Sequence, residues 1–216
     1  MLLEQTWSYA LAHQPDLWLA VRQHASLCAV AIAIATLSCV PLGIWTSRAR
    51  VGRSVVSFVT AARVVPSLAI LAFMLPISGI GYRSALVALI VLACPPILIN
   101  TDIAFRGIDP AIREAAIGMG MRSRQLLGRV EYPLALPVVI AGLRTSTVEV
   151  IASATLAAFI GGGGLGNFIL DGLANNDMRQ LLLGGVAVAF LALIAEIALG
   201  AAAYTAARRY GRTTVA

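Results

Sequence analysis

The chain has 216 residues, of which 59% are hydrophobic and 12% charged, and it carries a net charge of +6. Soluble domains are about 45–50% apolar and about 25% charged, so the composition predicts an all-α integral membrane protein and disfavours nucleic-acid-binding domains, secreted disulfide scaffolds and cytosolic enzymes. All 16 basic residues are Arg, and a chain without Lys holds neither a Walker-type ATPase site nor a Schiff-base enzyme.

Five apolar runs are long enough to cross a bilayer core about 30 Å thick as helices. They cover residues 25–46, 54–77, 84–105, 136–160 and 181–206. Eleven Arg residues lie on one side of these spans, three lie on the other side and two lie within spans. By the positive-inside rule the Arg-rich side is cytoplasmic, so we expect the N-terminus outside and the C-terminus inside. The predicted parts are an external segment 1–24, a transmembrane domain 25–206 and a cytoplasmic tail 207–216.

Prolines interrupt two of the spans. Pro66 lies in the second span, and Pro95 and Pro96 lie in the third. Each proline removes a backbone donor and clashes with the preceding turn, so we expect kinks or breaks, which either shape the packing or flank a moving pathway. The sequence has no internal repeat or inverted symmetry, which disfavours a self-contained secondary transporter. We therefore expect a solute channel between two copies, or between this chain and a related one.

The connection between the third and fourth spans is too polar to cross a membrane, yet its apolar residues recur at helical spacing. Asp109 followed by Pro110 predicts the start of a helix, and Gly118 and Gly120 predict the turn that ends it. Ser123 then predicts the cap of a second short helix, which Pro133 ends. A helix pair of this kind at the cytoplasmic face is suited to insert into a groove of a partner.

The helix pair, at residues 109–132, contains a recognisable motif. The motif residues are Glu114, Ala115, Ala116, Gly120, Val130 and Pro133. Their spacing resembles the Glu-Ala-Ala loop of bacterial ABC importer permeases, although that family has Ile in place of Val130 and Leu in place of Tyr132. The resemblance extends over about residues 41–200 and is most specific at 65–69, 96–101 and 160–167. It points to permeases for osmoprotectants such as glycine betaine, choline and carnitine, and the methionine-type permeases are close relatives.

The resemblance implies a type I ABC importer permease fold in the bacterial plasma membrane, surrounded by lipid. It also implies a second permease chain, the same or homologous, an extracytoplasmic substrate-binding protein, and separate ATPase subunits that use ATP and Mg²⁺. The residues implied to dock on the ATPase are Glu114, Ala115, Ala116, Met119, Gly120 and Met121. The alternative is a helical hairpin that only packs under the bundle. A DNA-reading helix-turn-helix is disfavoured, because it needs a soluble domain around it.

Along the fourth span, Thr145, Glu149 and Ser153 recur every four residues and form one polar stripe. The stripe is expected to face either the solute path or a neighbouring helix rather than lipid. Arg144 lies about 140° around the helix from Glu149, so Arg63 is the better candidate for an ion pair with this carboxylate. The predicted pathway residues are Arg63, Pro66, Ser67, Thr145, Glu149 and Ser153.

A glycine run follows the fourth span and matches the G-x-G-x-x-G pattern. It follows a membrane span rather than a strand, which excludes a dinucleotide site. The run predicts a flexible hinge with positive φ and close backbone approach. The family resemblance implies that this loop faces the binding protein. The predicted hinge and docking residues are Gly161, Gly162, Gly163, Gly164, Gly166 and Asn167.

No catalytic constellation is evident in the sequence. His13 and His24, the two histidines, precede the first span, and no Ser or Cys has a His and an acid beside it. The dispersed carboxylates form no convincing metal site. We therefore expect a non-catalytic subunit with no cofactor or metal of its own, rather than an intramembrane enzyme.

The Arg distribution generates a prediction of topology. Single cysteines placed near Arg50, Arg124 and Arg209 should react only with reagents that enter the cytoplasm, and cysteines at Gln5 and Asn176 should react from outside. The measurement is labelling in a background without the three native cysteines. External labelling at position 124 would contradict the predicted orientation.

Overall fold

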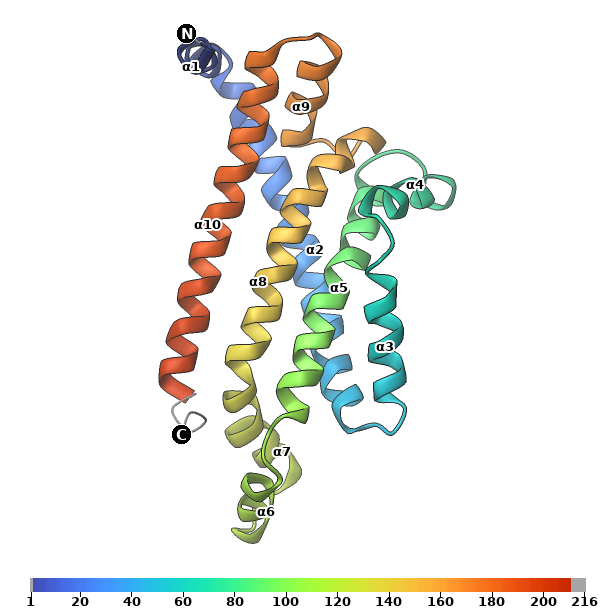
Figure 1. Cartoon of the computed structure of the whole chain (residues 1–216), viewed down its shortest axis with the longest axis vertical. Helices are drawn as coiled ribbons and strands as arrows, with labels where there is room; N and C mark the ends of the chain where they lie inside the picture. Colours follow the sequence, from blue (N-terminus) through green and yellow to red (C-terminus); the bar gives the residue numbers. More distant parts are fainter. Residues whose placement is uncertain (1, 211–216) are drawn as a thin grey trace. The chain divides into compact units, whose positions relative to one another are not determined.

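The protein is described by a computed structural model whose residues 2–210 are interpreted below. Within this range the chain forms helices and no strands (Figure 1). The elements are α1 (Leu2–Ala12), α2 (Gln14–Arg48), α3 (Gly52–Ala62), α4 (Ser67–Ser78), α5 (Tyr82–Arg106), α6 (Pro110–Gly118), α7 (Ser123–Leu126), a π-helical turn (Leu127–Glu131), α8 (Tyr132–Leu156), a 3₁₀ turn (Ala157–Ile160), α9 (Leu165–Ala174) and α10 (Met178–Tyr210). The prediction of an all-α protein is confirmed.

Five spans are present if the broken pair α3 and α4 counts as one. In the described range, α2, α5, the run from α7 through α8, and α10 are each long and apolar enough to cross a membrane. These helices extend beyond the predicted apolar runs. α2 already begins at Gln14, so the end of the predicted external segment is helical, and α10 continues to Tyr210. The rest of the predicted tail, 211–216, lies outside the described residues.

The expected break at Pro66 is confirmed. α3 ends at Ala62, and Pro66 has φ −59° and ψ 139°, an extended conformation that precedes α4. Pro95 and Pro96 do not break the third span, because both lie inside the continuous helix α5. A helix tolerates proline where neighbouring elements support the backbone groups that it frees.

The chain divides into two compact units, and each is described by itself. The first comprises residues 2–35 of the described range, Val65–Ala93 and Thr147–Glu196. Ala20, Leu165, Phe168 and Leu183 form a buried core from α2, α9 and α10. α9 packs tightly beside the start of α10, since a Cβ atom on Gly172 would lie 2.5 Å from the backbone nitrogen of Leu181 (Figure 1).

The second unit comprises Thr36–Val64, Cys94–Ser146 and residues 197–210 of the described range. Its core joins Phe105 at the end of α5, and Ile108 just after that helix, to Ala135 and Val139 of α8. Glycines allow α5 to approach its neighbours closely. A Cβ atom on Gly43 of α2 would lie 2.6 Å from the Thr101 Cβ, and one on Gly142 of α8 would lie 2.6 Å from the Asn100 Cβ. Small residues at such crossings let helix backbones approach one another in membrane proteins.

Candidate functional site

The first helix of the predicted cytoplasmic pair forms as expected. Asp109 precedes α6, and its Oδ1 accepts a hydrogen bond from the Ala111 N–H at 2.8 Å. Pro110 is the first helical residue, where its fixed φ suits the helix and its missing donor costs nothing. A short polar cap therefore defines where α6 begins.

Gly120 ends this helix through a left-handed turn. Its φ is +80°, its N–H donates to the Ile117 carbonyl at 2.8 Å, and the Met121 N–H donates to the Ala116 carbonyl at 3.2 Å. These two bonds form a Schellman motif, which satisfies carbonyls that the helix end would leave unpaired. The predicted turn is confirmed, and its geometry favours glycine at position 120.

The second helix differs from the prediction in two details. Ser123 is the first residue of α7 rather than its cap, and the backbone N–H of Arg122 donates to the Gln125 Oε1 at 2.9 Å instead. Pro133 does not end the helix, because α7, the π turn and α8 form one helical run. The π turn shifts the backbone hydrogen-bond register just before Pro133, which lets the run continue past a residue without an N–H.

The predicted docking residues differ in their exposure. Glu114, Ala115, Met119 and Gly120 are exposed, Met121 is half-buried and Ala116 is buried. Ile117, which the sequence pattern did not single out, is 60% exposed, and Met119 is 72% exposed. Ile117 lies off the repeating apolar face of α6, and this departure from the pattern was the available signal. Two large apolar side chains at the end of α6 therefore remain uncovered by this chain.

A buried carboxylate anchors α6 to the rest of its unit. The Glu131 side chain is 3% exposed and accepts hydrogen bonds from both Arg48 and Arg113. The Arg113 Nε lies 2.7 Å from the Glu131 Oε1, and its Nη2 donates to the Phe105 carbonyl at 2.5 Å. We call Arg48, Arg113 and Glu131 the anchor. It joins the end of α2, α6, the end of α5 and the π turn that leads into α8.

A second ion pair ties the same helix ends together. Arg106 forms a bidentate pair with Asp102, with distances of 3.0 and 2.7 Å, and its Nη2 also donates to the Thr46 carbonyl at 2.9 Å. A Cβ atom on Gly52 would lie only 1.8 Å from that same carbonyl oxygen. The ends of α2 and α5 and the start of α3 thus meet at one crowded point.

Sequence reasoning missed both ion pairs. Arg113 and Glu131 are 18 residues apart, and Arg48 and Glu131 are 83 apart. Only the spacing of Asp102 and Arg106, four residues apart on a helix, is a recognisable local signal. The others depend on tertiary folding, which no local pattern encodes.

The predicted pathway residues lie on separate elements. Arg63 and Pro66 are exposed in the connection between α3 and α4, and Ser67 begins α4. On α8, Thr145 is exposed, whereas Glu149 and Ser153 are half-buried. The positions directly after them on this helix are buried: Ser146, Val150 and Ala154. The polar stripe thus borders the buried face of α8, and its role in a solute path stays a prediction.

The glycine run is a tight turn between the 3₁₀ turn and α9. Gly161, Gly163 and Gly164 have φ values of +75°, +75° and +83°. A Cβ atom on Gly166 would lie 2.2 Å from the Thr155 carbonyl oxygen, and one on Gly162 would lie 2.8 Å from that of Ala157. Positive φ and close backbone approach are therefore confirmed. The hinge and docking roles stay predictions.

Known proteins similar to this chain are membrane subunits of transport systems. A family model described as binding-protein-dependent transport system inner membrane component matches residues 39–212. The chain is 44% identical over 205 residues to the carnitine transport permease protein OpuCB of Listeria monocytogenes, covering 94% of this chain and 87% of the relative. It is 40% identical over 181 residues to the choline transport system permease protein OpuBB of Bacillus subtilis, covering 83% of each chain.

A solved structure has the same fold. An inward-facing conformation of the MetNI methionine ABC transporter matches with a TM-score of 0.77, covering 88% of this chain and 95% of the matched chain at 22% identity. This likeness confirms the type I importer permease fold and carries no information about the solute.

The anchor generates a prediction about stability. Glu131→Gln should lower the free energy of unfolding by about 1–3 kcal/mol, because a neutral amide leaves two guanidinium groups without a counter-charge. This expected loss of stability is smaller than for a fully buried ion pair, because the Arg48 side chain is half-exposed. The measurement is thermal unfolding of the purified chain. Glu114→Gln, the same change on an exposed side chain, is the matched control, and equal melting temperatures for the two variants would contradict the anchor.

Proposed function

Because the chain belongs to the family of binding-protein-dependent transport system inner membrane components, we propose that it is one of two transmembrane subunits of an ATP-driven importer for osmoprotectants such as glycine betaine, choline or carnitine. The chain is a multi-pass permease of the bacterial inner membrane. The observation that carries the solute class is the extensive identity with carnitine and choline permeases over most of this chain.

The proposed importer divides its tasks among several chains. Separate ATPase subunits bind ATP and Mg²⁺ and perform the hydrolysis, and a binding protein outside the membrane delivers the solute. A second permease chain, the same or homologous, completes the channel. This chain contributes half of the pathway and the surface on which an ATPase subunit docks.

The exposed end of α6 supports the docking role. Ile117 and Met119 present large apolar side chains beside Glu114 and the small Ala115. An apolar helix end with one adjacent charge suits insertion into a groove of a partner, and the flexible Met side chain adapts to its surroundings. The docking core in this proposal is Glu114, Ala115, Ala116, Ile117, Met119, Gly120 and Met121.

The anchor supports the transmission of movement from α6 to the spans. Arg113 binds both Glu131 and the Phe105 carbonyl, so a displacement of α6 pulls directly on the end of α5 and on the π turn before α8. A flexible loop would instead absorb such a displacement. In this proposal ATPase closure moves α6, and α5 and α8 carry the movement along their length to the stripe containing Glu149.

Two alternatives predict different behaviour. A permease for an amino acid such as methionine would share the fold, but its uptake would not be inhibited by an excess of glycine betaine, choline or carnitine. A self-sufficient secondary transporter would move solute along an ion gradient in membranes that lack the ATPase subunit. Uptake of labelled osmoprotectants into vesicles with and without the ATPase subunit and ATP separates both from the proposal.

The docking role predicts that Gly120→Val abolishes most uptake without preventing membrane insertion, because a β-branched residue at φ +80° deforms the turn after α6. Gly118→Val is the matched control, since this glycine does not have a positive φ and a Cβ atom there would contact nothing within 4 Å. Glu114→Lys should also reduce uptake by reversing the exposed charge. The measurements are uptake and co-purification of the ATPase subunit. Normal values of both for Gly120→Val and Glu114→Lys would remove the docking assignment.

The pathway role predicts that Glu149→Gln lowers uptake while the amount of assembled complex stays normal. Glu196→Gln, which alters a half-buried carboxylate in α10, serves as the control and should transport normally. If Glu149 only balances Arg63, the amount of complex should fall instead, and Arg63→Gln should restore it. Normal uptake by Glu149→Gln at normal abundance would show that the stripe serves ordinary helix packing.

A further inference from the structure

The segment before the first predicted span exposes large apolar side chains. Trp7 and Leu11 of α1 are 67% and 51% exposed, and Trp18 of α2 is 61% exposed. α1 has 11 residues, so it is about 16 Å long and cannot cross a bilayer core of about 30 Å. A helix that neither crosses the membrane nor buries these side chains in the protein needs another apolar surface to cover them.

The surface of α1 has three sides of different chemistry. One side packs on the protein, because Thr6 is buried and Tyr9 is half-buried. Trp7 and Leu11, one turn apart, form an exposed apolar edge. The exposed Ser8 follows Trp7 at about 100° around the helix and belongs to a polar edge that borders the apolar one. A helix with an apolar and a polar edge side by side is suited to lie in the plane of a membrane interface.

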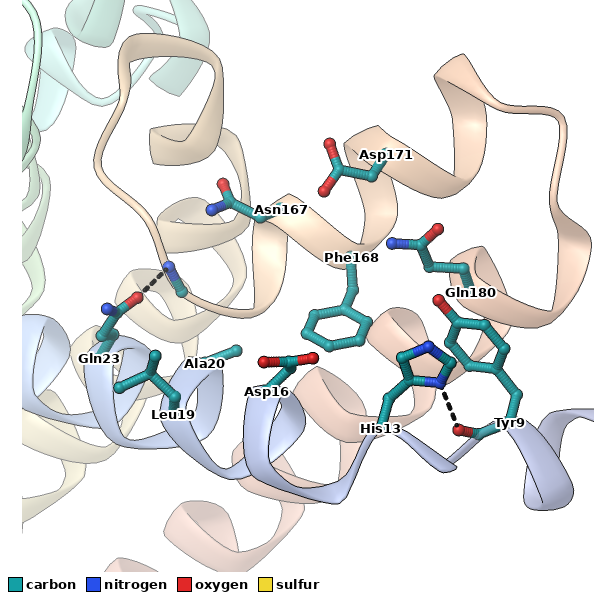
Figure 2. Close-up of a pocket in the computed structure, with 11 residues that line it drawn as sticks. Tyr9, His13, Asp16, Leu19, Ala20, Gln23, Asn167, Phe168, Asp171 and Gln180 are labelled. Carbon is teal, nitrogen blue, oxygen red and sulfur yellow. Dashed lines mark hydrogen bonds between the residues drawn. The ribbon is translucent and has the colours of Figure 1, made fainter. Parts of the chain in front are cut away.

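Both exposed indoles lie on the outer surface of their unit. The inner sides of α1 and α2 border a cavity of about 330 Å³, whose lining includes Tyr9 and Asp16 (Figure 2). Trp7 and Trp18 are each two residues from one of these, which is about 200° around a helix, so both indoles are turned away from the cavity. The His13 ring stacks on the Tyr9 ring with centroids 4.1 Å apart, and this contact fixes the corner between the two helices.

α1 lies at the level where α10 becomes apolar. Figure 1 shows α1 along its axis beside the start of α10, which runs down the view. The Arg179 guanidinium lies 5.9 Å from the Tyr9 ring centroid, and the apolar run of α10 begins two residues later, at Leu181. On α2, Ala29 lies on the same side as Trp18, is exposed and already belongs to the predicted span. The apolar edge is therefore continuous with the part of the chain that the bilayer surrounds.

A cation stands beside the second indole. The Arg22 guanidinium lies 5.9 Å from the Trp18 ring centroid, and both side chains are exposed. Within residues 2–210 the Arg22 guanidinium forms no salt bridge or hydrogen bond. Helical side chains lean toward the N-terminus, so this one leans toward the external side, where the lipid headgroups lie. A guanidinium matches a phosphate in charge and geometry, and Trp is enriched at the same depth of the membrane.

We propose that Trp7, Leu11, Trp18 and Arg22, the interfacial corner, lie among the lipids of the outer leaflet, where Arg22 binds a headgroup phosphate. Lipid is the occupant because the apolar edge continues a membrane-embedded surface and the adjacent cation complements phosphate. The inference rests on the membrane location of the chain and is independent of the solute that the importer carries.

The interfacial corner is joined to the glycine turn. Gln23 directly follows Arg22, and its Oε1 accepts a hydrogen bond from the Gly164 N–H at 3.3 Å (Figure 2). The helix turn that holds the lipid phosphate therefore also holds the turn before α9. Contact with the outer leaflet thereby helps to position the external surface of this unit.

The test measures tryptophan fluorescence of the purified full chain in phosphatidylcholine vesicles. The chain contains three Trp residues, so Trp18→Phe/Trp45→Phe and Trp7→Phe/Trp45→Phe each leave one reporter. Lipids brominated just below the headgroup should remove about half or more of the emission of either reporter, and aqueous iodide should remove little. The matched control is Ser8→Trp in a chain whose three native Trp residues are Phe, and this reporter on the polar edge should show the reverse pattern.

The phosphate contact is tested with Trp18 as the reporter. Two brominated lipids are added in turn, as a minor component, to phosphatidylcholine vesicles: phosphatidylcholine itself and a galactosyl diacylglycerol, which has no phosphate. The phospholipid should quench Trp18 about twofold more strongly, because Arg22 retains phosphate headgroups beside it. Arg22→Gln should remove this difference, and Arg22→Lys, which keeps the charge, should preserve most of it.

Three outcomes overturn the proposal in chains with normal helix content and melting temperature. If iodide quenches Trp7 as strongly as the Ser8→Trp reporter, the apolar edge lies in water. If the two brominated lipids quench Trp18 equally while Arg22 is present, Arg22 does not bind a lipid phosphate. If Trp7 becomes protected from iodide only after the substrate-binding protein or a second permease chain is added, the edge is a protein-docking surface instead.

Discussion

The carboxylate of Glu131 is almost completely removed from water, and a buried charge is tolerated only when opposite charges and hydrogen bonds surround it. Its partners Arg48 and Arg113 come from distant parts of the sequence. The requirement to pair this one group therefore brings the end of α2, the helix α6 and the π turn to a single point. Apart from its two short connections, α6 is thereby also tied to the spans through the side chain of Arg113.

Close packing of helix backbones adds to the contacts of the anchor. Lipid is as apolar as the helix surfaces, so burial of apolar area drives helix association in a membrane far less than it does in water. Contact between backbones takes its place, and Gly43 and Gly142 permit it on two sides of α5. Larger residues at these positions would separate the helices. The residues around Asn100 and Thr101, which are specific to the family resemblance, are the ones that these glycines contact.

Local features of the fold could be predicted from the sequence, whereas long-range contacts could not. Asp109 before Pro110 and the glycine at position 120 act within a few residues, so their helix start and turn were predictable. Pro133 was misread because the π turn before it, which keeps the helical run continuous, leaves no local signal in the sequence. The cavity lined by Asp16 and Asp171 (Figure 2) was missed because its walls come from segments about 150 residues apart in the chain.

The external side of the chain can be acidic although the net charge of the chain is positive. The positive-inside rule acts on Arg and Lys, while Asp and Glu contribute little to orientation. Eleven Arg residues on the predicted cytoplasmic side therefore secure the topology and account for the positive net charge. The external connections contain four acids and three Arg residues, one of which, Arg179, is already paired with Asp177. Acidic residues on the external side are thus compatible with the orientation signal, whereas additional Arg residues there would weaken it.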